Sequence, residues 1–596
     1  MTVNHKKIAY NSAQIIRIIG HKDIYPEDEN IPELASLIKK IPREMLIKLS
    51  MTLINLYNNA DIDDMQFFFS RNNETLKYDF NARFKQCLSL NSDPNLKFIF
   101  CTTQTATELL KQAFSIPYES KKNISEDSLE ENILKAILII NDKLTDYKYT
   151  VKGRGFLEKM AGMMVVNSFS QKDINSFDFK EIFKEYFTKS IDLFEYVVSD
   201  KYFAPIYNRF LEKLQIISYK EYISTILGLF TIVYQNASQK KNIHNKEQWA
   251  SSFFYDPNIN TDNLIKTSVL DYISLFVKKD ISLEENPDYR EFRNKPLIKF
   301  PDCSYKMVNI GFLLERLFSS LYFDFKAIAK ELSLSNFEDE YKQSFMEKTL
   351  LCKYIENINS FQQYEAVSSK DSRLISQEGG EPDYYLNNNK DSIILFENKD
   401  ILINGVVKQE RDFDKIIFEY KNKLLLKTHS NGRVLKKAKP EGIGQLVEQI
   451  KKIQTENAFW DKEASKESII YPVLVVGDTK LLPEGLSYLM QNWYEERCTS
   501  EKINRNNIRP LVIMSISTIL LYSQEFKDNG FEFYFEEYYK SINAKVENLQ
   551  NPLVYIINLS ISFSEYMKQV YPKSFFDIYN SYKEKIFPNS SIINCF

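Results

Sequence analysis

A chain of 596 residues is too long for a single hydrophobic core, so two to four domains are expected. Apolar residues make up 44% and charged residues 26% of the chain, which excludes a disordered or fibrous protein. The formal net charge of −3 gives no global attraction to nucleic acid, so any binding of that kind has to come from local patches.

The metal-binding residue types are dispersed along the chain. No two cysteines form a CxxC pair, and the four histidines are equally scattered, which argues against a structural zinc site and indicates a reduced setting. The N-terminal residues lack a signal-peptide core, and no window of about 18 uninterrupted apolar residues occurs. We therefore expect a soluble cytoplasmic protein that does not associate with membranes. The cysteines are Cys87, Cys101, Cys303, Cys352, Cys498 and Cys595.

Residues 1–300 carry apolar side chains mostly at helical spacing, which predicts one or more helical domains. The run 97–101 resembles a strand but has helical neighbours. The polar, Asn-rich segment 236–263 is expected to be a long surface loop and a sub-boundary. Three prolines make 287–303 the candidate domain boundary. No motif assigns a role to this half, and we expect it to act as a sensor, a substrate clamp or a surface for a protein partner or oligomer.

The pattern changes after a helical connector at residues 301–336. A long amphipathic helix with Glu347 near its middle is followed by two strands, a helix, a strand, a helix and a strand. This order predicts a mixed α/β sheet flanked by helices over residues 337–522, with residues 401–407 as a candidate further strand. Residues 523–596 are expected to form a helical C-terminal extension.

The stretch 381–400, EPDYYLNNNKDSIILFENKD, predicts a β-hairpin. Aromatic and β-branched residues favour strands on both sides, and the Asn- and Asp-rich gap suits a turn. Because side chains alternate along a strand, Glu397 and Lys399 share one face and Asn398 points to the other. The hairpin can bring Asp383 beside them, which gives two carboxylates and a lysine at the end of an apolar hairpin.

This constellation suits a divalent cation. Two neighbouring carboxylates repel unless a cation lies between them, and Mg²⁺ prefers such hard oxygen ligands together with water and phosphate. Asp383 and Glu397 are therefore the candidate ligands of Mg²⁺ or Mn²⁺. Lys399 is the candidate catalytic lysine, which would position or deprotonate the attacking water or stabilise developing negative charge.

Pro382-Asp383, a gap and Glu397-x-Lys399 at the end of an apolar strand resemble the core of the PD-(D/E)XK nuclease superfamily. The resemblance covers roughly residues 337–520 and implies a restriction-endonuclease-like fold. It also implies an Mg²⁺-dependent endonuclease that hydrolyses phosphodiester bonds, of the kind used in restriction or antiphage defence. We favour DNA over RNA as the substrate, and RNA remains open. Asn398 departs from the family pattern, because the family usually has an apolar residue at that position.

Two further positions follow from the same resemblance. The helix before the hairpin often supplies a glutamate in this family, and Glu347 matches it as a further metal ligand. The helix after the hairpin often carries a glutamine, which makes Gln445 a candidate catalytic residue, with Gln449 one turn further on.

The residues between 421 and 439 carry only basic charge, in a chain that is slightly acidic overall. Such a run beside the candidate site could follow a phosphate backbone, whereas charge runs more often form a solvated loop. The candidate nucleic-acid-binding residues are Lys421, Lys423, Lys427, Arg433, Lys436, Lys437 and Lys439.

Two alternatives remain open at this point. If Asp383 only caps a turn and Glu397 and Lys399 form an ordinary ion pair, the domain is a catalytically inactive, nuclease-like subunit for nucleic-acid binding or assembly. In the other alternative the chain is a helical interaction protein whose α/β segment is purely structural.

Overall fold

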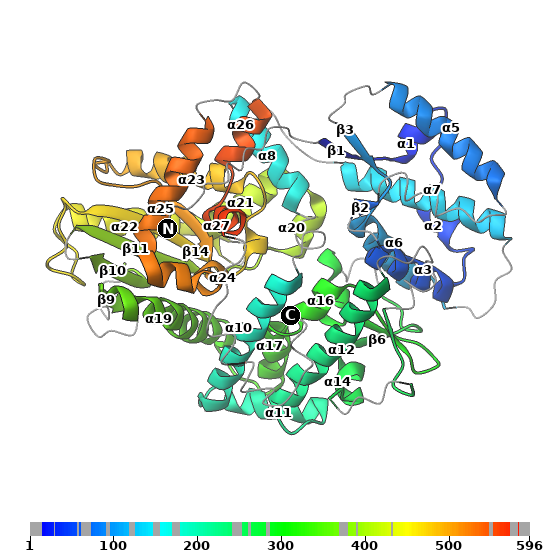
Figure 1. Ribbon diagram of the computed structural model, residues 1–596, viewed down its shortest axis with the longest axis horizontal. Helices are drawn as coiled ribbons and strands as arrows, with labels where there is room; N and C mark the ends of the chain where they lie inside the picture. The colour runs from blue at the N-terminus through cyan, green and yellow to red at the C-terminus, as the bar shows by residue number, and fades with distance from the viewer. Residues whose placement is uncertain are drawn as a thin grey trace. The chain divides into compact units, whose positions relative to one another are not determined.

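The computed structural model of the protein (Figure 1) describes residues 15–28, 30–56, 59–60, 73–90, 96–118, 125–146, 155–169, 179–240, 253–259, 264–281, 287–368, 380–388, 391–430, 433–546, 552–571 and 582. These residues form two compact units. Unit 1 contains residues 155–169 and the described residues from 334 onward, and unit 2 contains residues 15–146 and 179–333. The division at 333/334 lies near the expected start of the α/β region, whereas the segment 287–303 lies inside unit 2.

Unit 1 is organised around a mixed five-stranded sheet with the order β15-β14-β11-β10-β9. The central strand β11 runs antiparallel to β10 and parallel to β14. The strands of this sheet are β9 (Glu365–Ser368), β10 (Tyr384–Asn388), β11 (Ser392–Lys399), β14 (Ile469–Val476) and β15 (Val512–Ser515). Strands β12 (Leu426–Ser430) and β13 (Arg433–Pro440) form a separate antiparallel pair.

Helices surround this sheet. They are α8 (Phe156–Phe169), α18 (Phe337–Asp339), the π-helical segment η2 (Glu340–Leu351), α19 (Cys352–Gln362), α20 (Gly405–Glu410), α21 (Phe413–Leu424), α22 (Ile443–Gln454), the 3₁₀ turn η4 (Thr479–Leu481), α23 (Leu486–Ser500), α24 (Ile516–Leu521), α25 (Ser523–Val546), α26 (Pro552–Leu559) and α27 (Phe563–Val570). The expected mixed α/β architecture is therefore confirmed for this part of the chain.

The alternation of side chains along β11 explains the layers of unit 1. Phe396 points to one face and packs against Phe531 of α25, with 5.4 Å between the ring centroids. Glu397 points to the opposite face, where it meets Gln449 of α22. Helices α25 and α22 therefore cover opposite faces of the sheet. The described part of the expected C-terminal extension belongs to this unit, because its aromatic residues cover one face of the sheet.

Two segments of unit 1 differ from the sequence-based expectation. Residues 401–407 do not add a strand, because the Asn404 side chain caps α20 by accepting a hydrogen bond from the Val406 amide at 3.0 Å. Residues 426–430 and 433–440, in the basic run, form the two strands β12 and β13, whereas a solvated loop was one of the two alternatives for this run.

The described residues of unit 2 form three small sheets: β1–β3, β2–β4 and the four-stranded order β5-β8-β7-β6. Its strands are β1 (Ile15–Ile18), β2 (Asn59–Ala60), β3 (Leu96–Ile99), β4 (Cys101–Thr102), β5 (Phe254–Tyr255), β6 (Ser274–Phe276), β7 (Leu297–Lys299) and β8 (Tyr305–Met307). Its helices are α1 (His21–Ile24), α2 (Leu34–Ile38), α3 (Arg43–Leu56), α5 (Glu74–Leu90), α6 (Thr103–Ser115), α7 (Glu126–Thr145), α10 (Phe179–Ser199), α11 (Ala204–Leu214), α12 (Tyr219–Lys240), α14 (Thr267–Tyr272), η1 (Pro287–Tyr289), α15 (Arg290–Asn294), α16 (Ile310–Glu315) and α17 (Leu321–Glu331).

The structure differs from the expectations for the N-terminal half at three places. The run 97–101 contributes to strands β3 and β4. Within 236–263, α12 continues to Lys240 and β5 pairs with β8, while residues 241–252 and 260–263 lie outside the described part. The segment 287–303 supplies β7, which lies inside the four-stranded sheet, so the chain cannot be divided there.

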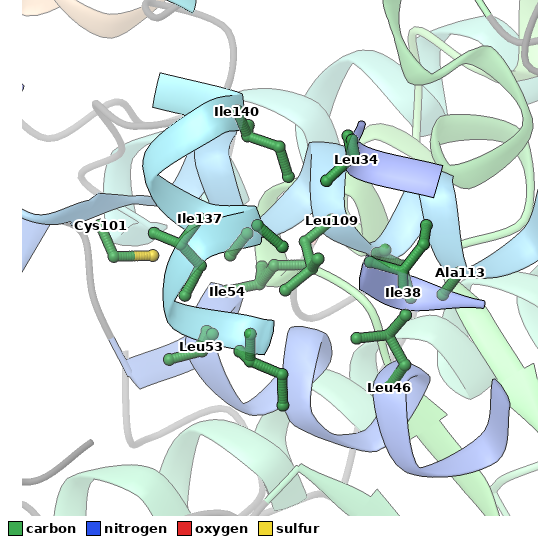
Figure 2. Close-up of a cluster of buried hydrophobic side chains, with 14 of the residues drawn as sticks. Leu34, Ile38, Leu46, Leu53, Ile54, Cys101, Leu109, Ala113, Ile137 and Ile140 are labelled. Atoms are coloured by element: carbon green, nitrogen blue, oxygen red, sulfur yellow. The ribbon is translucent and has the colours of Figure 1, made fainter. Parts of the chain in front are cut away.

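The core of unit 2 is apolar, and a cluster of buried polar groups around Asn141 lies beside it. Figure 2 shows Leu34, Ile54, Leu109 and Ile137 converging from different helices. Beside this core the buried Asn141 donates to the carbonyls of Ile19 and Phe100, each at 2.7 Å, and accepts from Thr105. A buried amide with these partners is satisfied, and it ties the ends of two strands to α6 and α7.

No single described helix is long and apolar enough to cross a membrane, although the bent pair Ala204–Leu214 and Tyr219–Val233 passes the test of length and composition together. The five described cysteines are free thiols. Cys595 lies outside the described residues.

The buried Lys306 of β8 makes the stability of unit 2 depend on pH. Its ammonium donates to Thr52 Oγ1 at 3.0 Å and to the Lys48 carbonyl at 3.2 Å, and the residue is 2% exposed. Burial, reinforced by Lys48, lowers the pKa of Lys306 to about 7. Between this pKa and the ordinary value near 10.5, the unfolded chain binds a proton that the folded chain does not, so the free energy of unfolding rises with pH in that window.

We therefore expect Lys306→Met to stabilise the protein by about 2 to 5 kcal/mol below pH 7, with the gain shrinking toward pH 10. Urea unfolding between pH 6 and 10 measures this difference. The exposed Lys330→Met serves as the matched control and should change the free energy of unfolding little at any pH. A gain that does not change with pH would contradict the assignment.

Candidate active site

The hairpin register places Asp383 beside the end of β11. Tyr384 pairs with Phe396, so Asp383 follows on the same face as Glu397. The Asp383 Oδ2 atom accepts a hydrogen bond from the backbone amide of Asn398 at 2.7 Å. The hairpin therefore brings Asp383, Glu397 and Lys399 to one end of the sheet, as the sequence predicted.

Glu397 is a fully buried carboxylate at the centre of the site. Its Oε1 atom lies 2.9 Å from Lys399 Nζ, and its Oε2 atom accepts from Gln449 Nε2 at 2.9 Å. Glu397 is 0% exposed, and the Lys399 side chain retains 19% exposure. Because a buried charge without partners is costly, these two contacts make the carboxylate tolerable inside the sheet.

The electrostatics of the site show an excess of negative charge. Burial raises the pKa of Asp383 well above its ordinary value, and the charges of Glu397 and Glu347 raise it further. Burial also raises the pKa of Glu397, although Lys399 and Gln449 oppose the shift. For Lys399, burial alone lowers the pKa, but the nearby carboxylates outweigh it and the pKa lies above its ordinary range. Further positive charge would stabilise this arrangement.

Glu347 reaches the site from a π-helical segment. It lies on η2, in the helix before the hairpin, and its charge acts on Asp383. Thr349 Oγ1 donates to the Ser344 carbonyl five residues earlier at 2.7 Å, in keeping with the wide turns of a π-helix. Hydrophobic periodicity predicted the helix but not its π register.

The glutamine that contacts the site is Gln449, not Gln445. The Gln445 side chain accepts from the Gly442 backbone amide at 2.9 Å and so caps the start of its own helix. One turn later, Gln449 Nε2 donates both to Glu397 and to the Glu381 carbonyl, at 3.1 Å in the second case. The side chain of Gln449 is fully buried and fixes the orientation of the Glu397 carboxylate.

Glu441 is a site residue that the sequence analysis missed. Its Oε2 atom lies 3.7 Å from Lys399 Nζ, and its charge also acts on Glu397. The residue directly follows β13, and its amide donates to the Leu425 carbonyl at the base of β12. Gly442 and Gly444 make this junction compact, because an added Cβ would lie 2.8 Å from the Leu424 carbonyl oxygen and 2.3 Å from that of Leu425, respectively. The only sequence signal was an acidic residue immediately after a basic run.

The donor set fits a hard divalent cation held by two carboxylates. Among the described residues, no group of three or more His, Cys, Asp or Glu side chains could hold a metal ion together. Mg²⁺ needs only one or two carboxylates, because water and phosphate oxygens fill its other positions. One buried oxygen beside Glu397, Gln449 Oε1, accepts no hydrogen bond from the described residues. An unsatisfied buried acceptor of this kind suits a hydrated cation.

The seven candidate basic residues divide into two groups. Lys421 lies over the Trp493 ring at 5.2 Å, and Lys423 pairs with Glu419 at 2.6 Å and donates to the Leu402 carbonyl. Both therefore have intramolecular contacts within unit 1. The other five lie on the two-stranded pair β12–β13: Lys427, Arg433, Lys436, Lys437 and Lys439.

The comparisons with known proteins add no constraint to this geometry. The chain matches no protein-family model, no curated protein and no solved structure. The interpretation of the site therefore depends on its own residues.

The pairing of Glu397 with Lys399 predicts a strong energetic coupling. Removing either partner leaves the other charge buried, so Lys399→Met and Glu397→Gln should each destabilise the fold, and the double variant should lose less than the sum. We expect a coupling free energy of about 1 to 3 kcal/mol from a double-mutant cycle in urea unfolding. The pair Lys540–Glu537, whose charged atoms are 3.0 Å apart and whose side chains are 70% and 21% exposed, is the control and should give less than about 1 kcal/mol. Equal coupling in the two pairs would contradict a buried ion pair.

Proposed function

We propose that unit 1 is a metal-dependent nuclease domain with a restriction-endonuclease-like fold, acting on phosphodiester bonds of DNA. The observation that carries this proposal is the meeting of Asp383, Glu397 and Lys399 at one end of the sheet, with Glu347 close enough to act on Asp383. The mixed sheet and the helices before and after the hairpin support the resemblance to the PD-(D/E)XK superfamily.

Each residue has a chemical role in this proposal. Asp383 and Glu397 would hold Mg²⁺ or Mn²⁺, with Glu347 as a further acidic group beside Asp383. When bound, such a cation lowers the pKa of water and offsets the negative charge that develops on the phosphate. The ammonium group of Lys399 would donate hydrogen bonds to the attacking water or to a phosphate oxygen. Gln449 would keep the Glu397 carboxylate in a fixed orientation.

Glu441 would restrain the position of the catalytic lysine. Its carboxylate and that of Glu397 both approach Lys399 Nζ, at 3.7 Å and 2.9 Å. An ammonium group held between two carboxylates is confined to one region of the site, which limits the orientations that its hydrogen bonds can take. Glu441 therefore acts as a positioning residue through Lys399.

Cleavage of supercoiled plasmid DNA tests the proposal. We expect the wild-type protein to cleave in Mg²⁺ or Mn²⁺ and to stop in EDTA, because the two carboxylates need the cation. Asp383→Asn, Glu397→Gln and Lys399→Ala should each lower the rate at least about 100-fold. Lys540→Ala, which changes an exposed lysine of the same unit, is the control and should keep the wild-type rate.

Two outcomes would contradict the proposal. One is equal cleavage by wild type and Lys399→Ala. The other is no cleavage by wild type of plasmid, linear duplex, single-stranded DNA or RNA, which would favour the inactive, nuclease-like binding subunit.

The two glutamines of α22 give a second, more selective test. Gln449→Leu should lower the cleavage rate at least about tenfold, since Glu397 loses the donor that orients its carboxylate. Gln445→Leu should change the rate less than about threefold, because Gln445 contacts its own helix terminus. Initial rates at saturating Mg²⁺ for the two variants measure the difference, and a larger loss in Gln445→Leu would overturn the assignment of Gln449.

A further inference from the structure

The strands β12 and β13 form a basic ribbon, defined here as residues 426–430 and 433–440. Arg433, Lys436, Lys437 and Lys439 are exposed, and Lys427 is half-buried. None of these five side chains makes a hydrogen bond, ion pair or ring contact with another residue in the described part of the chain. Residues 421–440 contain no acidic residue, so the ribbon carries uncompensated positive charge in a chain of net charge −3.

The arrangement of these cations is unfavourable without an anionic partner. Lys427 and Lys439 lie directly opposite each other across the two strands, and like charges in that position destabilise a strand pair. Lys436 and Lys437 are adjacent and exposed on β13, in the stretch where the register of the strand pair shifts. Four of the five cations therefore lie on β13.

The ribbon is held against α21 through contacts of β12. The Asn422 side chain of α21 donates to the His429 carbonyl at 3.1 Å and accepts from the amides of Thr428 and His429, each at 2.8 Å. The His429 ring packs edge-on against Phe418, with 4.9 Å between the ring centroids. At the other strand, Glu441 follows β13 directly and reaches Lys399. The ribbon is therefore a braced arm that starts at the candidate active site.

We infer that the basic ribbon inserts into the major groove of duplex DNA, so that the substrate of the site is a double-stranded DNA. This inference rests on the proposed nuclease function. A two-stranded ribbon with its side chains is about 10 Å thick, and the major groove of B-DNA is about 12 Å wide. Eight residues of β13 span at most about 26 Å, which is less than one helical turn of about 34 Å. The exposed cations of β13 then lie near the phosphates that border the groove.

Other nucleic acids fit the ribbon less well. Proteins that bind single strands stack bases on aromatic side chains, and residues 426–440 contain no Phe, Tyr or Trp. The major groove of duplex RNA is too deep and narrow for a ribbon. Val434, which is 74% exposed, gives the ribbon an apolar side chain of the kind that contacts thymine methyl groups in the major groove.

Fluorescence anisotropy with the full chain in EDTA tests the inference without cleavage. The probes are a labelled 30-base-pair DNA duplex, one of its single strands and the duplex RNA of the same sequence. We expect the DNA duplex to bind at least tenfold more tightly than the other two. The triple variant Lys436→Ala/Lys437→Ala/Lys439→Ala should bind the DNA duplex at least tenfold more weakly. The negative slope of log affinity against log salt should become shallower by about 2 to 3 in this variant.

Two matched variants complete the experiment. The arginine replacements at the same three positions should restore duplex binding, which excludes a folding defect. Lys462→Ala/Lys466→Ala/Lys540→Ala removes three exposed lysines of the same unit and should bind like wild type. Equal binding of duplex and single strand, tighter binding of duplex RNA, or unchanged binding by the ribbon variant would each overturn the inference.

The binding experiment separates this inference from the proposed function. Asp383→Asn should keep duplex binding in EDTA while losing cleavage in Mg²⁺, because the ribbon is intact. If the ribbon variants lose duplex binding but the wild-type protein never cleaves, the nuclease proposal fails and the inference that the ribbon binds duplex DNA is retained. If wild type cleaves but the ribbon variants bind and cleave normally, the ribbon inference fails alone.

Discussion

The buried carboxylate of Glu397 is the constraint on which the rest of the site depends. It lies on the central strand of the sheet and is shielded from solvent, where an isolated charge is strongly unfavourable. Lys399 from the same strand and Gln449 from α22 each take one of its oxygens. Helix α22 therefore has to pack over the sheet next to Glu397. The compact glycine junction before α22 then sets where that helix begins.

The charges around this carboxylate indicate what kind of ligand the site can bind. A structural ion pair needs one negative charge for one positive charge, whereas Lys399 has Glu397, Asp383 and Glu441 around it, and Glu347 acts on Asp383. Burial raises the pKa values of both Asp383 and Glu397, and neighbouring acidic groups raise them further. Such an arrangement lowers the stability of the fold, and a bound divalent cation would offset that loss of stability.

Local sequence patterns predicted the central part of the site well, because a hairpin is a local structure. Strand composition and the turn between the strands were enough to bring Asp383 beside Glu397. Gln449 was harder to identify, since the choice between two glutamines one turn apart depends on how α22 lies over the sheet. Glu441 was missed because its contact with Lys399 joins residues 42 positions apart across the ribbon.

The short strands of unit 2 could not be predicted for a different reason. Strands of two to four residues show no measurable alternation, and their neighbours have strong helical periodicity. The prolines of 287–303 indicated a boundary, but β7 between them pairs with β6 and β8. The basic run was also ambiguous. Its charge does not reveal that residues 433–440 form a strand, or that Glu441 directly after this strand contacts Lys399.

Anomalous diffraction from a crystal of the protein soaked in Mn²⁺ tests the central claim most directly. The account predicts an anomalous peak bound by the carboxylates of Asp383 and Glu397, and the loss of that peak in Asp383→Asn. No peak at these carboxylates at millimolar Mn²⁺, or an equal peak in Asp383→Asn, would contradict it.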